Sequence, residues 1–281
     1  MDGKILEKAK LVLLGAMCGD IIGSGYEFNP TKDLNFPIIT STSHPTDDSV
    51  CSIAIADALI SATSHATDSL ATIFTQSLQR WCRKYPRAGY GGHFHSWIRL
   101  EKPYPYNSWG NGSAMRVSPV GALSQNLNQV MTLAEKSASV THNHREGVKG
   151  AQATAVAIYL ALRGASKEEI KSLIEKGFGY DLSRNYYDIQ PDYTFDVSCQ
   201  GSVPEAIICF LTATDYESTI RHAVAMGGDA DTMGAIAGGI AAAYYGEIPA
   251  SLLSECEQRI PDDMKEVIKN FNNLLTSVYS R

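Results

Sequence analysis

Apolar residues recur at helical spacing through most of this 281-residue chain, and this period constrains its fold more than any other feature. In residues 69–83, for example, Leu70, Ile73, Phe74 and Leu78 fall on one helical face. Because the pattern recurs along the chain, we expect an all-α protein. The predicted helices cover residues 6–22, 48–63, 69–83, 112–123, 127–139, 145–163, 166–176, 203–213, 215–226, 232–245 and 261–278.

Signals for β-strands are sparse by comparison. Only residues 36–40 have the β-branched character of a short strand, and no alternating pair of segments flanks a hairpin turn. No linker composition or internal repeat divides the chain, which is long enough to bury a complete core. We therefore expect one compact domain over residues 1–281. The longest irregular stretches, 84–111 and 177–202, are predicted to be functional or to carry short structure of their own.

The composition limits the cellular compartment and the classes of binding partner that we expect. The formal net charge is −6, so the chain lacks the basic surface of a general nucleic-acid binder. Its six cysteines form no C-x-x-C pair, which is typical of small core hydrophobes in a reducing compartment. The apolar run over residues 11–14 is too short for a signal peptide or a membrane span. We expect a cytoplasmic monomer with no nucleic-acid or membrane partner.

Two acidic clusters stand at the start of apolar helices. Residues 46–49 read Thr-Asp-Asp-Ser, and residues 228–232 read Gly-Asp-Ala-Asp-Thr. Helix capping accounts for one such side chain, and acidic first turns complement the helix dipole. Capping does not require the pair Gly227-Gly228 ahead of two carboxylates. These glycines indicate a backbone conformation closed to other residues, or a ligand that approaches closely.

Together the clusters offer four carboxylates and two threonine hydroxyls on two helix N-termini. Hard oxygen ligands without His or Cys select Mg²⁺, Mn²⁺ or Ca²⁺ over zinc. A two-metal site holds its ions about 3.5–4 Å apart and can orient a substrate and activate water. If the clusters meet in space, the sequence predicts a binuclear site. Its candidate ligands are Thr46, Asp47, Asp48, Asp229, Asp231 and Thr232.

Six short motifs follow one another along the chain. They are GDIIG at 19–23 with Glu27, TDDS at 46–49, NGSAMR at 111–116, TH at 141–142, VPEA at 203–206 and GDADT at 228–232. In this order they resemble the motifs of the ADP-ribosylglycohydrolase family, and the match runs from about residue 11 to residue 246. The family motif at residues 46–49 most often ends in threonine where this chain has Ser49, a position that is not normally a ligand.

The resemblance implies a compact, orthogonal helical bundle with two Mg²⁺ or Mn²⁺ ions in a central cleft. It also implies hydrolysis of the bond between the anomeric carbon of ADP-ribose and a side chain, so the partner is an ADP-ribosylated protein or conjugate. The six candidate ligands match the family's metal-binding positions. Glu27 matches a glutamate over the metal site, and Glu27 and Asp48 are the two candidates for the base that activates water.

The turn at residues 111–116 is a candidate for binding pyrophosphate. Free amides at Gly112, Ser113 and Ala114 would suit this group, although an ordinary cap by Asn111 or Ser113 explains the turn equally well. The resemblance also makes His142 a contact for ADP-ribose. The predicted substrate-binding residues are Asn111, Gly112, Ser113, Met115 and His142, with Tyr104, Tyr106 and Trp109 as candidates for stacking on adenine.

We favour arginine as the side chain linked to ADP-ribose. The alternatives are release of ADP-ribose from serine or from O-acetyl-ADP-ribose, and a non-catalytic protein that binds ADP-ribose. A non-catalytic member is expected to lose ligands, whereas all six candidate ligands and Glu27 are present here. Leaving-group selectivity is expected to come from residues 84–111 and 177–202.

Overall fold

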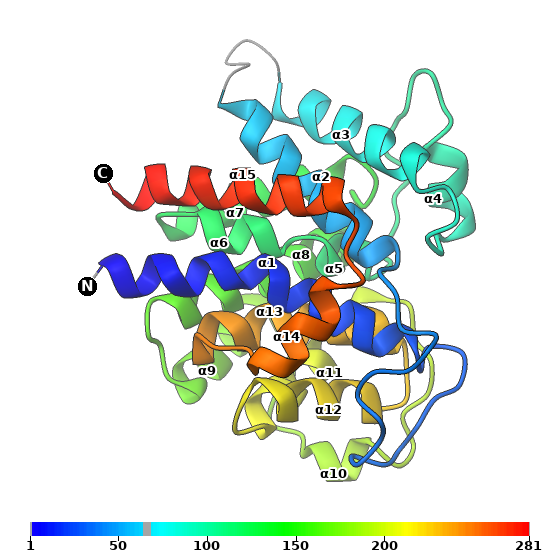
Figure 1. The fold of residues 1–281 in the computed structure, drawn as a ribbon, viewed down its shortest axis with the longest axis vertical. Coiled ribbons are helices and arrows are strands. Elements are labelled where there is room, and N and C mark those ends of the chain that lie inside the picture. The colour runs from blue at the N-terminus through cyan, green and yellow to red at the C-terminus, as the bar shows by residue number, and fades with distance from the viewer. Residues whose placement is uncertain (1, 64–68, 281) are drawn as a thin grey trace.

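The computed structural model describes residues 2–63 and 69–280, and within these ranges it contains fifteen helices and no strand (Figure 1). The fold is therefore all-α, as predicted. The helices are α1 (Asp2–Ser24), α2 (Asp47–Ala62), α3 (Leu70–Lys84), α4 (Gly92–Trp97), α5 (Gly112–Met115), α6 (Ser118–Leu123), α7 (Leu127–Ser139), α8 (Arg145–Leu162), α9 (Lys167–Phe178), α10 (Tyr186–Ile189), α11 (Cys199–Thr212), α12 (Tyr216–Ala225), α13 (Ala230–Tyr245), α14 (Ala250–Glu257) and α15 (Asp262–Tyr279).

Most of the predicted helices are confirmed, with two kinds of difference. The predicted helix over 112–123 is two short helices, α5 and α6, because Pro119 occupies the first turn of α6 and cannot continue a hydrogen-bonded helix from α5. Three short helices were not predicted. Of these, α4 and α10 lie in the irregular stretches that were expected to carry local structure, and α14 follows Pro249.

The predicted strand over residues 36–40 is wrong. This segment has no strand partner within the described residues, and side chains donate to two of its backbone carbonyls instead. Arg221 Nη1 donates to the carbonyl of Phe36 at 2.9 Å, and the Tyr26 hydroxyl donates to the carbonyl of Pro37. The apolar character of the segment reflects burial of Phe36 against the core.

Helices α1 and α13 pack at backbone contact in the middle of the molecule (Figure 1). A Cβ built on Gly19 would lie 1.9 Å from the carbonyl oxygen of Gly234, and one on Gly23 would lie 2.2 Å from that of Ala230. Ordinary side chains at these positions would hold the helices further apart. The small residues of both helices therefore let their backbones approach closely.

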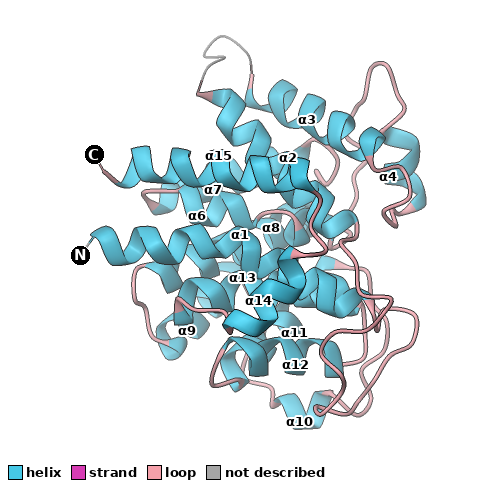
Figure 2. Cartoon of the chain, in the orientation of Figure 1, coloured by secondary structure: helices cyan, strands magenta, loops and turns pink. Residues whose placement is uncertain are grey.

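This contact brings the C-terminal half of α1 beside the N-terminus of α13. Helix α2 begins next to the same place, since Thr46 and Ser49 bond to Asp20 of α1. Many of the connecting loops gather on one side of the bundle, the right-hand side in Figure 2. The acidic clusters predicted from the sequence therefore meet at one end of three packed helices.

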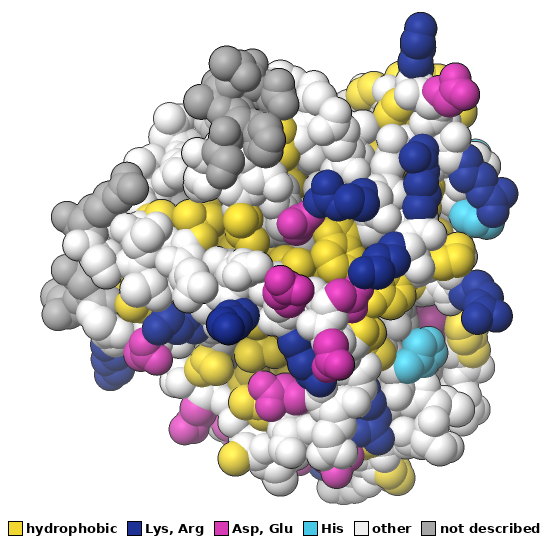
Figure 3. Space-filling model, turned by 45° about the horizontal axis from the view of Figure 1, so that its top comes forward, with side chains coloured by type: hydrophobic (Ala, Val, Ile, Leu, Met, Phe, Trp, Pro, Cys, Tyr) yellow, Lys and Arg dark blue, Asp and Glu magenta, His cyan; other side chains and the backbone are white. Residues whose placement is uncertain are grey.

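The buried cysteines and the mixed charges on the surface are those expected from the composition. All six cysteines are buried, which confirms them as core residues. Acidic and basic side chains lie beside one another on the face shown in Figure 3, with apolar patches between them. No helix in the described ranges combines the length and the apolar character needed to cross a membrane.

Candidate functional site

A cleft of about 500 Å³ lies at the end of the bundle where α2 and α13 begin. Its walls come from both acidic clusters, from the turn before α5, and from parts of the two long irregular stretches, including Tyr106 and Phe195. The cleft thus brings together residues that are far apart in the chain. The predicted site residues that line it are Glu27, Asp47, Asp48, Asn111, Gly112, Met115, His142, Asp229, Asp231 and Thr232.

The first acidic cluster does not need its carboxylates for capping. Thr46 is the N-cap of α2, and its hydroxyl accepts a hydrogen bond from the Asp48 amide at 3.3 Å. The Asp47 amide donates to the carbonyl of Ala88 at 2.7 Å. Both aspartate side chains therefore remain available, and both line the cleft.

The second acidic cluster, at the start of α13, likewise does not use its first carboxylate for capping. Asp229 occupies the N-cap position, but its side chain makes no capping hydrogen bond. It instead accepts a hydrogen bond of 2.7 Å from the amide of Asn111. Gly227 has φ of 76°, which confirms the expected special backbone. At Gly228 the Tyr193 ring approaches closely, 2.3 Å from a built Cβ.

Asp20 is a buried member of the site that the sequence did not single out as a site residue. It accepts hydrogen bonds from the Thr46 hydroxyl at 2.6 Å, from the Thr46 amide at 3.0 Å and from the Ser49 amide at 3.0 Å. The Ser49 hydroxyl also donates to it. Asp20 therefore fixes the start of α2 from behind, and its place in the glycine motif at residues 19–23 was the available signal.

Carboxylate oxygens from three helices and one loop gather in two overlapping groups. Asp20, Asp48 and Asp231 each place an oxygen within 4.8 Å of the others, and so do Glu27, Asp229 and Asp231. Asp231 belongs to both groups. Among the described residues, the buried Oδ1 atom of Asp48 has no hydrogen-bond partner. Such an arrangement of hard anionic oxygens suits divalent cations.

The pKa values of these carboxyl groups reflect burial and mutual repulsion. Burial, followed by the charge of Asp231, raises the pKa of Asp20 from 3.8 to about 7 and that of Glu27 from 4.5 to about 8. The same two causes, in the same order, raise the pKa values of Asp47, Asp48 and Asp229 well above their usual range. A nearby cation would favour the charged forms.

The turn at residues 111–116 only partly matches its prediction. Asn111, Gly112 and Met115 line the cleft, but Ser113 is fully buried and its hydroxyl donates to the carbonyl of Gly147 at 2.7 Å. The expected free amide at Ala114 is wrong, because it donates to the carbonyl of Asn111 at 2.8 Å. This bond closes the short turn of α5. The side chain of Asn111 does not cap α5, and its amide donates a hydrogen bond to Asp229 instead.

Some of the aromatic and histidine residues considered for the site line the cleft, and others lie outside it. Tyr106 lines the cleft, with its ring 6.2 Å from that of His142, whereas Tyr104 and Trp109 are exposed outside it. His144 caps α8 by accepting a hydrogen bond from the Glu146 amide. His144 is thus the cap of α8, and His142 lies in the cleft wall.

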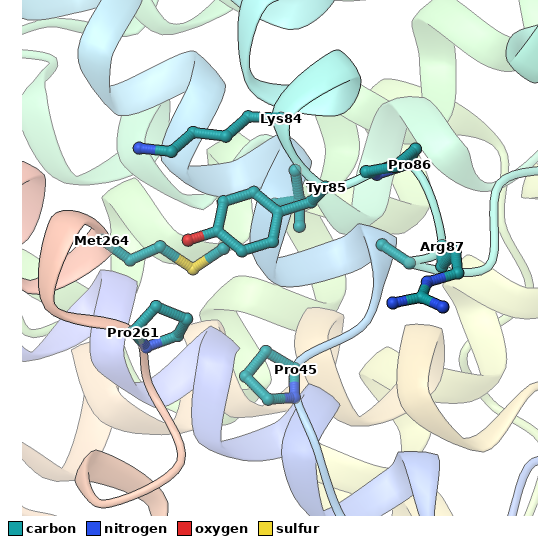
Figure 4. A pocket seen from close by; sticks show the side chains of 9 residues that line it. Pro45, Lys84, Tyr85, Pro86, Arg87, Pro261 and Met264 are labelled. Atoms are coloured by element: carbon teal, nitrogen blue, oxygen red, sulfur yellow. The ribbon is translucent and has the colours of Figure 1, made fainter.

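A second hollow, of about 320 Å³, lies where the end of α3 meets the start of α15 (Figure 4). Its walls include Pro45, Pro86 and Pro261. The Tyr85 hydroxyl there donates to Asp263 at 2.6 Å. We attribute this hollow to the packing of α15 on α2, since Val50 and Met264 line it and none of the predicted site residues does.

The family profile of ADP-ribosylglycohydrolases matches residues 1–280. The chain belongs to the ADP-ribosylglycohydrolase family. This membership makes it a hydrolase of bonds to ADP-ribose, acting on ADP-ribosylated substrates.

Relatives of this family member cover nearly its whole length. ADP-ribosylhydrolase ARH3 of Homo sapiens is 26% identical over 90% of both chains. ADP-ribosylarginine hydrolase Tri1 of Pseudomonas putida is 27% identical, over 86% of this chain and 71% of its own. A solved structure described as an ADP-ribosylglycohydrolase-related protein complex superposes with a TM-score of 0.73 at 25% identity and covers 97% of this chain.

The departure of this ADP-ribosylglycohydrolase from the common family motif has a simple structural basis. Ser49 faces Asp20, to which both its amide and its hydroxyl donate. A threonine at this position carries the same hydroxyl. The serine therefore keeps the hydrogen bond that holds Asp20 against the start of α2.

Proposed function

We propose that this protein hydrolyses the bond between ADP-ribose and an arginine side chain, with two Mg²⁺ ions bound in the carboxylate cleft. Mn²⁺ is the expected substitute. The observation that carries the proposal is the pair of overlapping carboxylate groups that share Asp231. A shared carboxylate between two groups of oxygens is the ligand arrangement expected for a binuclear site.

The side chains present fit divalent ions in number and type. The proposed ligands are oxygen donors, and one of them, Asp48, has a buried oxygen without a partner. When bound, the two ions would offset the crowded negative charge, bind the vicinal hydroxyls of the ribose and polarise the reacting groups. The residues proposed to hold them are Thr46, Asp47, Asp48, Asp229, Asp231 and Thr232.

Neighbouring side chains orient these ligands. The Thr46 hydroxyl donates its proton to Asp20 and accepts a bond from the Asp48 amide, so one lone pair of its oxygen remains to bind a cation. Asn111 donates to one oxygen of Asp229, which fixes the rotation of that carboxylate. Such outer contacts raise metal affinity because the ligands are ordered before the ion arrives.

Of the two candidate bases, we favour Glu27. It is half-buried at the edge of the cleft, where water can reach it, whereas Asp48 is only 2% exposed. Glu27 would take a proton from the attacking water as positive charge develops on the sugar ring. Asp48 then has the role of a ligand.

An exposed aromatic ring at the cleft supports arginine as the leaving group. Five acidic residues line the cleft, and Arg116 is the only arginine or lysine among the described residues that do so. Two divalent ions and Arg116 would together offset all five negative charges. The exposed ring of Phe28, which lines the cleft beside Glu27, favours a cationic guanidinium over an uncharged serine.

The test compares peptides ADP-ribosylated on arginine and on serine, each incubated with the protein in Mg²⁺ or in EDTA. We expect release of ADP-ribose from the arginine peptide in Mg²⁺ alone. Asp231→Ala should abolish release, and the exposed Asp188→Ala should leave it unchanged. Cleavage of the serine peptide alone would refute the arginine assignment, and full activity in EDTA would refute the metal site.

A further inference from the structure

Arg116 is a buried cation at the wall of the cleft, and none of the described residues forms an ion pair with it. It is 1% exposed, and its Nη2 donates to the carbonyl of Ser137 at 3.0 Å and to the Thr141 hydroxyl at 2.9 Å. A guanidinium group can only donate hydrogen bonds. One lone pair of the Thr141 oxygen is therefore occupied by Arg116.

The proton of the Thr141 hydroxyl then has two possible acceptors. The Nδ1 atom of His142 is 2.7 Å from the hydroxyl oxygen, and the carbonyl of Ala138 is 3.5 Å away. The first distance is that of a good hydrogen bond, and the second is too long for one between two oxygens. The hydroxyl thus donates to Nδ1, which must be unprotonated.

The surroundings of His142 keep the ring neutral. Burial, and then the charge of Arg116, lowers its pKa well below 6.5. A neutral ring with an unprotonated Nδ1 carries its proton on Nε2.

The Nε2 atom faces the part of the cleft where two glycines stand. A Cβ built on Gly112 would lie 3.2 Å from Nε2, and one on Gly110 would lie 3.6 Å from it. Both glycines line the cleft, as does His142. A side chain at position 112 would cover the donor, so the absence of one keeps it open.

We propose that Arg116 and Thr141 are positioning residues that hold His142 as a neutral donor, with Nε2–H directed into the cleft toward a phosphate oxygen of the ligand. A phosphate oxygen only accepts hydrogen bonds, so this tautomer matches it and the other does not. The identity of the ligand, ADP-ribose, rests on the proposed function, whereas the tautomer rests on the contacts of Thr141 alone.

The experiment measures the tautomer and the binding separately, on the full chain. Imidazole ¹⁵N NMR, with the His142 signals assigned by their loss in His142→Asn, should show a protonated Nε2 and an unprotonated Nδ1. Thr141→Val should give mixed tautomers and weaken ADP-ribose binding about fivefold by calorimetry in Mg²⁺. Thr141→Ser, which keeps the hydroxyl, should restore both readouts.

Gly112→Ala provides a second variant should Thr141→Val fold poorly. It should weaken ADP-ribose binding and leave the tautomer unchanged. A protonated Nδ1 in the wild type, or equal affinity in wild type and Thr141→Val, would overturn the inference. If the wild type shows the expected tautomer but does not bind ADP-ribose, the proposed function fails and the positioning role of Thr141 is supported.

Discussion

A methyl group on Gly19 of α1 would lie 1.9 Å from the carbonyl oxygen of Gly234 on α13. The two helices therefore touch through their backbones, with no side chain between them. Asp20 is next to Gly19, and Asp231 is one helical turn before Gly234. Their carboxylates consequently belong to the same cluster of oxygens. The site depends on how closely α1 and α13 approach.

Gly19→Ala should lower the free energy of unfolding by about 3 kcal/mol, because the added methyl group must push two backbones apart. Urea unfolding followed by circular dichroism measures this loss. The same displacement should weaken Mg²⁺ binding, since it moves Asp20 away from Asp231. Gly177→Ala in α9 is the matched control, because its Cβ meets nothing within 4 Å and an alanine favours the helix. A Gly19→Ala protein as stable as Gly177→Ala would contradict the close contact.

Asp20→Asn should lower Mg²⁺ affinity about 10- to 100-fold, as expected for loss of an outer partner of a ligand. The new carboxamide keeps only one accepting oxygen, so it cannot accept all four hydrogen bonds that Thr46 and Ser49 donate, and the start of α2 loses part of its support. Calorimetric titration with Mg²⁺ measures the change. As a control, Asp57→Asn removes a carboxylate on α2 that bonds Trp81 and Ser77 outside the cleft. It should reduce stability and leave Mg²⁺ affinity as in the wild type.

Without divalent ions, stability should fall as the pH rises. The folded protein binds protons more tightly than the unfolded chain at Asp20 and Glu27, whose pKa values are raised to about 7 and about 8 from 3.8 and 4.5. Their contribution is complete below about pH 4 and is lost as the pH approaches about 8. Urea unfolding in EDTA across this range measures the effect, and Glu27→Gln should make the dependence shallower. Identical pH profiles for the two proteins would contradict the raised pKa of Glu27.

Glu27→Gln and Asp48→Asn should separate the two candidate bases. The first should reduce kcat at least about 100-fold and change Mg²⁺ affinity little, because the lost group is the proton acceptor. The second should weaken Mg²⁺ binding, because a buried ligand is lost. Measuring kcat at saturating Mg²⁺, together with Mg²⁺ affinity, distinguishes them. If Asp48→Asn binds Mg²⁺ normally but does not turn over, Asp48 is the base.

Phe28→Ala should raise KM for an ADP-ribosylarginine peptide about threefold, through loss of a contact between the ring and the guanidinium group. Phe28 is 87% exposed and lines the cleft. The affinity for free ADP-ribose should not change, because this ligand lacks the arginine. Leu173→Ala, an exposed apolar residue on α9 outside the cleft, is the control. A change in ADP-ribose affinity would place Phe28 against the nucleotide instead.

The sequence predicted the long helices well because each buries an apolar face that is visible in its period. It failed at residues 36–40, where β-branched side chains pack on the core without a partner strand, and at Pro119, which splits a helix. The acidic clusters were recognisable because their carboxylates exceed what capping needs. Asp20 was harder to recognise, since its role depends on α1 meeting α2. Burial of the Ser113 hydroxyl was likewise not visible in the sequence, because it depends on the carbonyl of Gly147.

The pairing of α1 with α13 also bears on how the protein folds. Tyr216 donates to the carbonyl of Gly15 across 201 positions of sequence, and the glycine contact spans a similar length. Contacts of such long range form slowly, since most of the chain must be ordered before they are made. During synthesis, α1 must wait for α13 to emerge. The carboxylate groups can assemble only after that docking, so divalent-ion binding would serve as a kinetic marker for one of the last steps of folding.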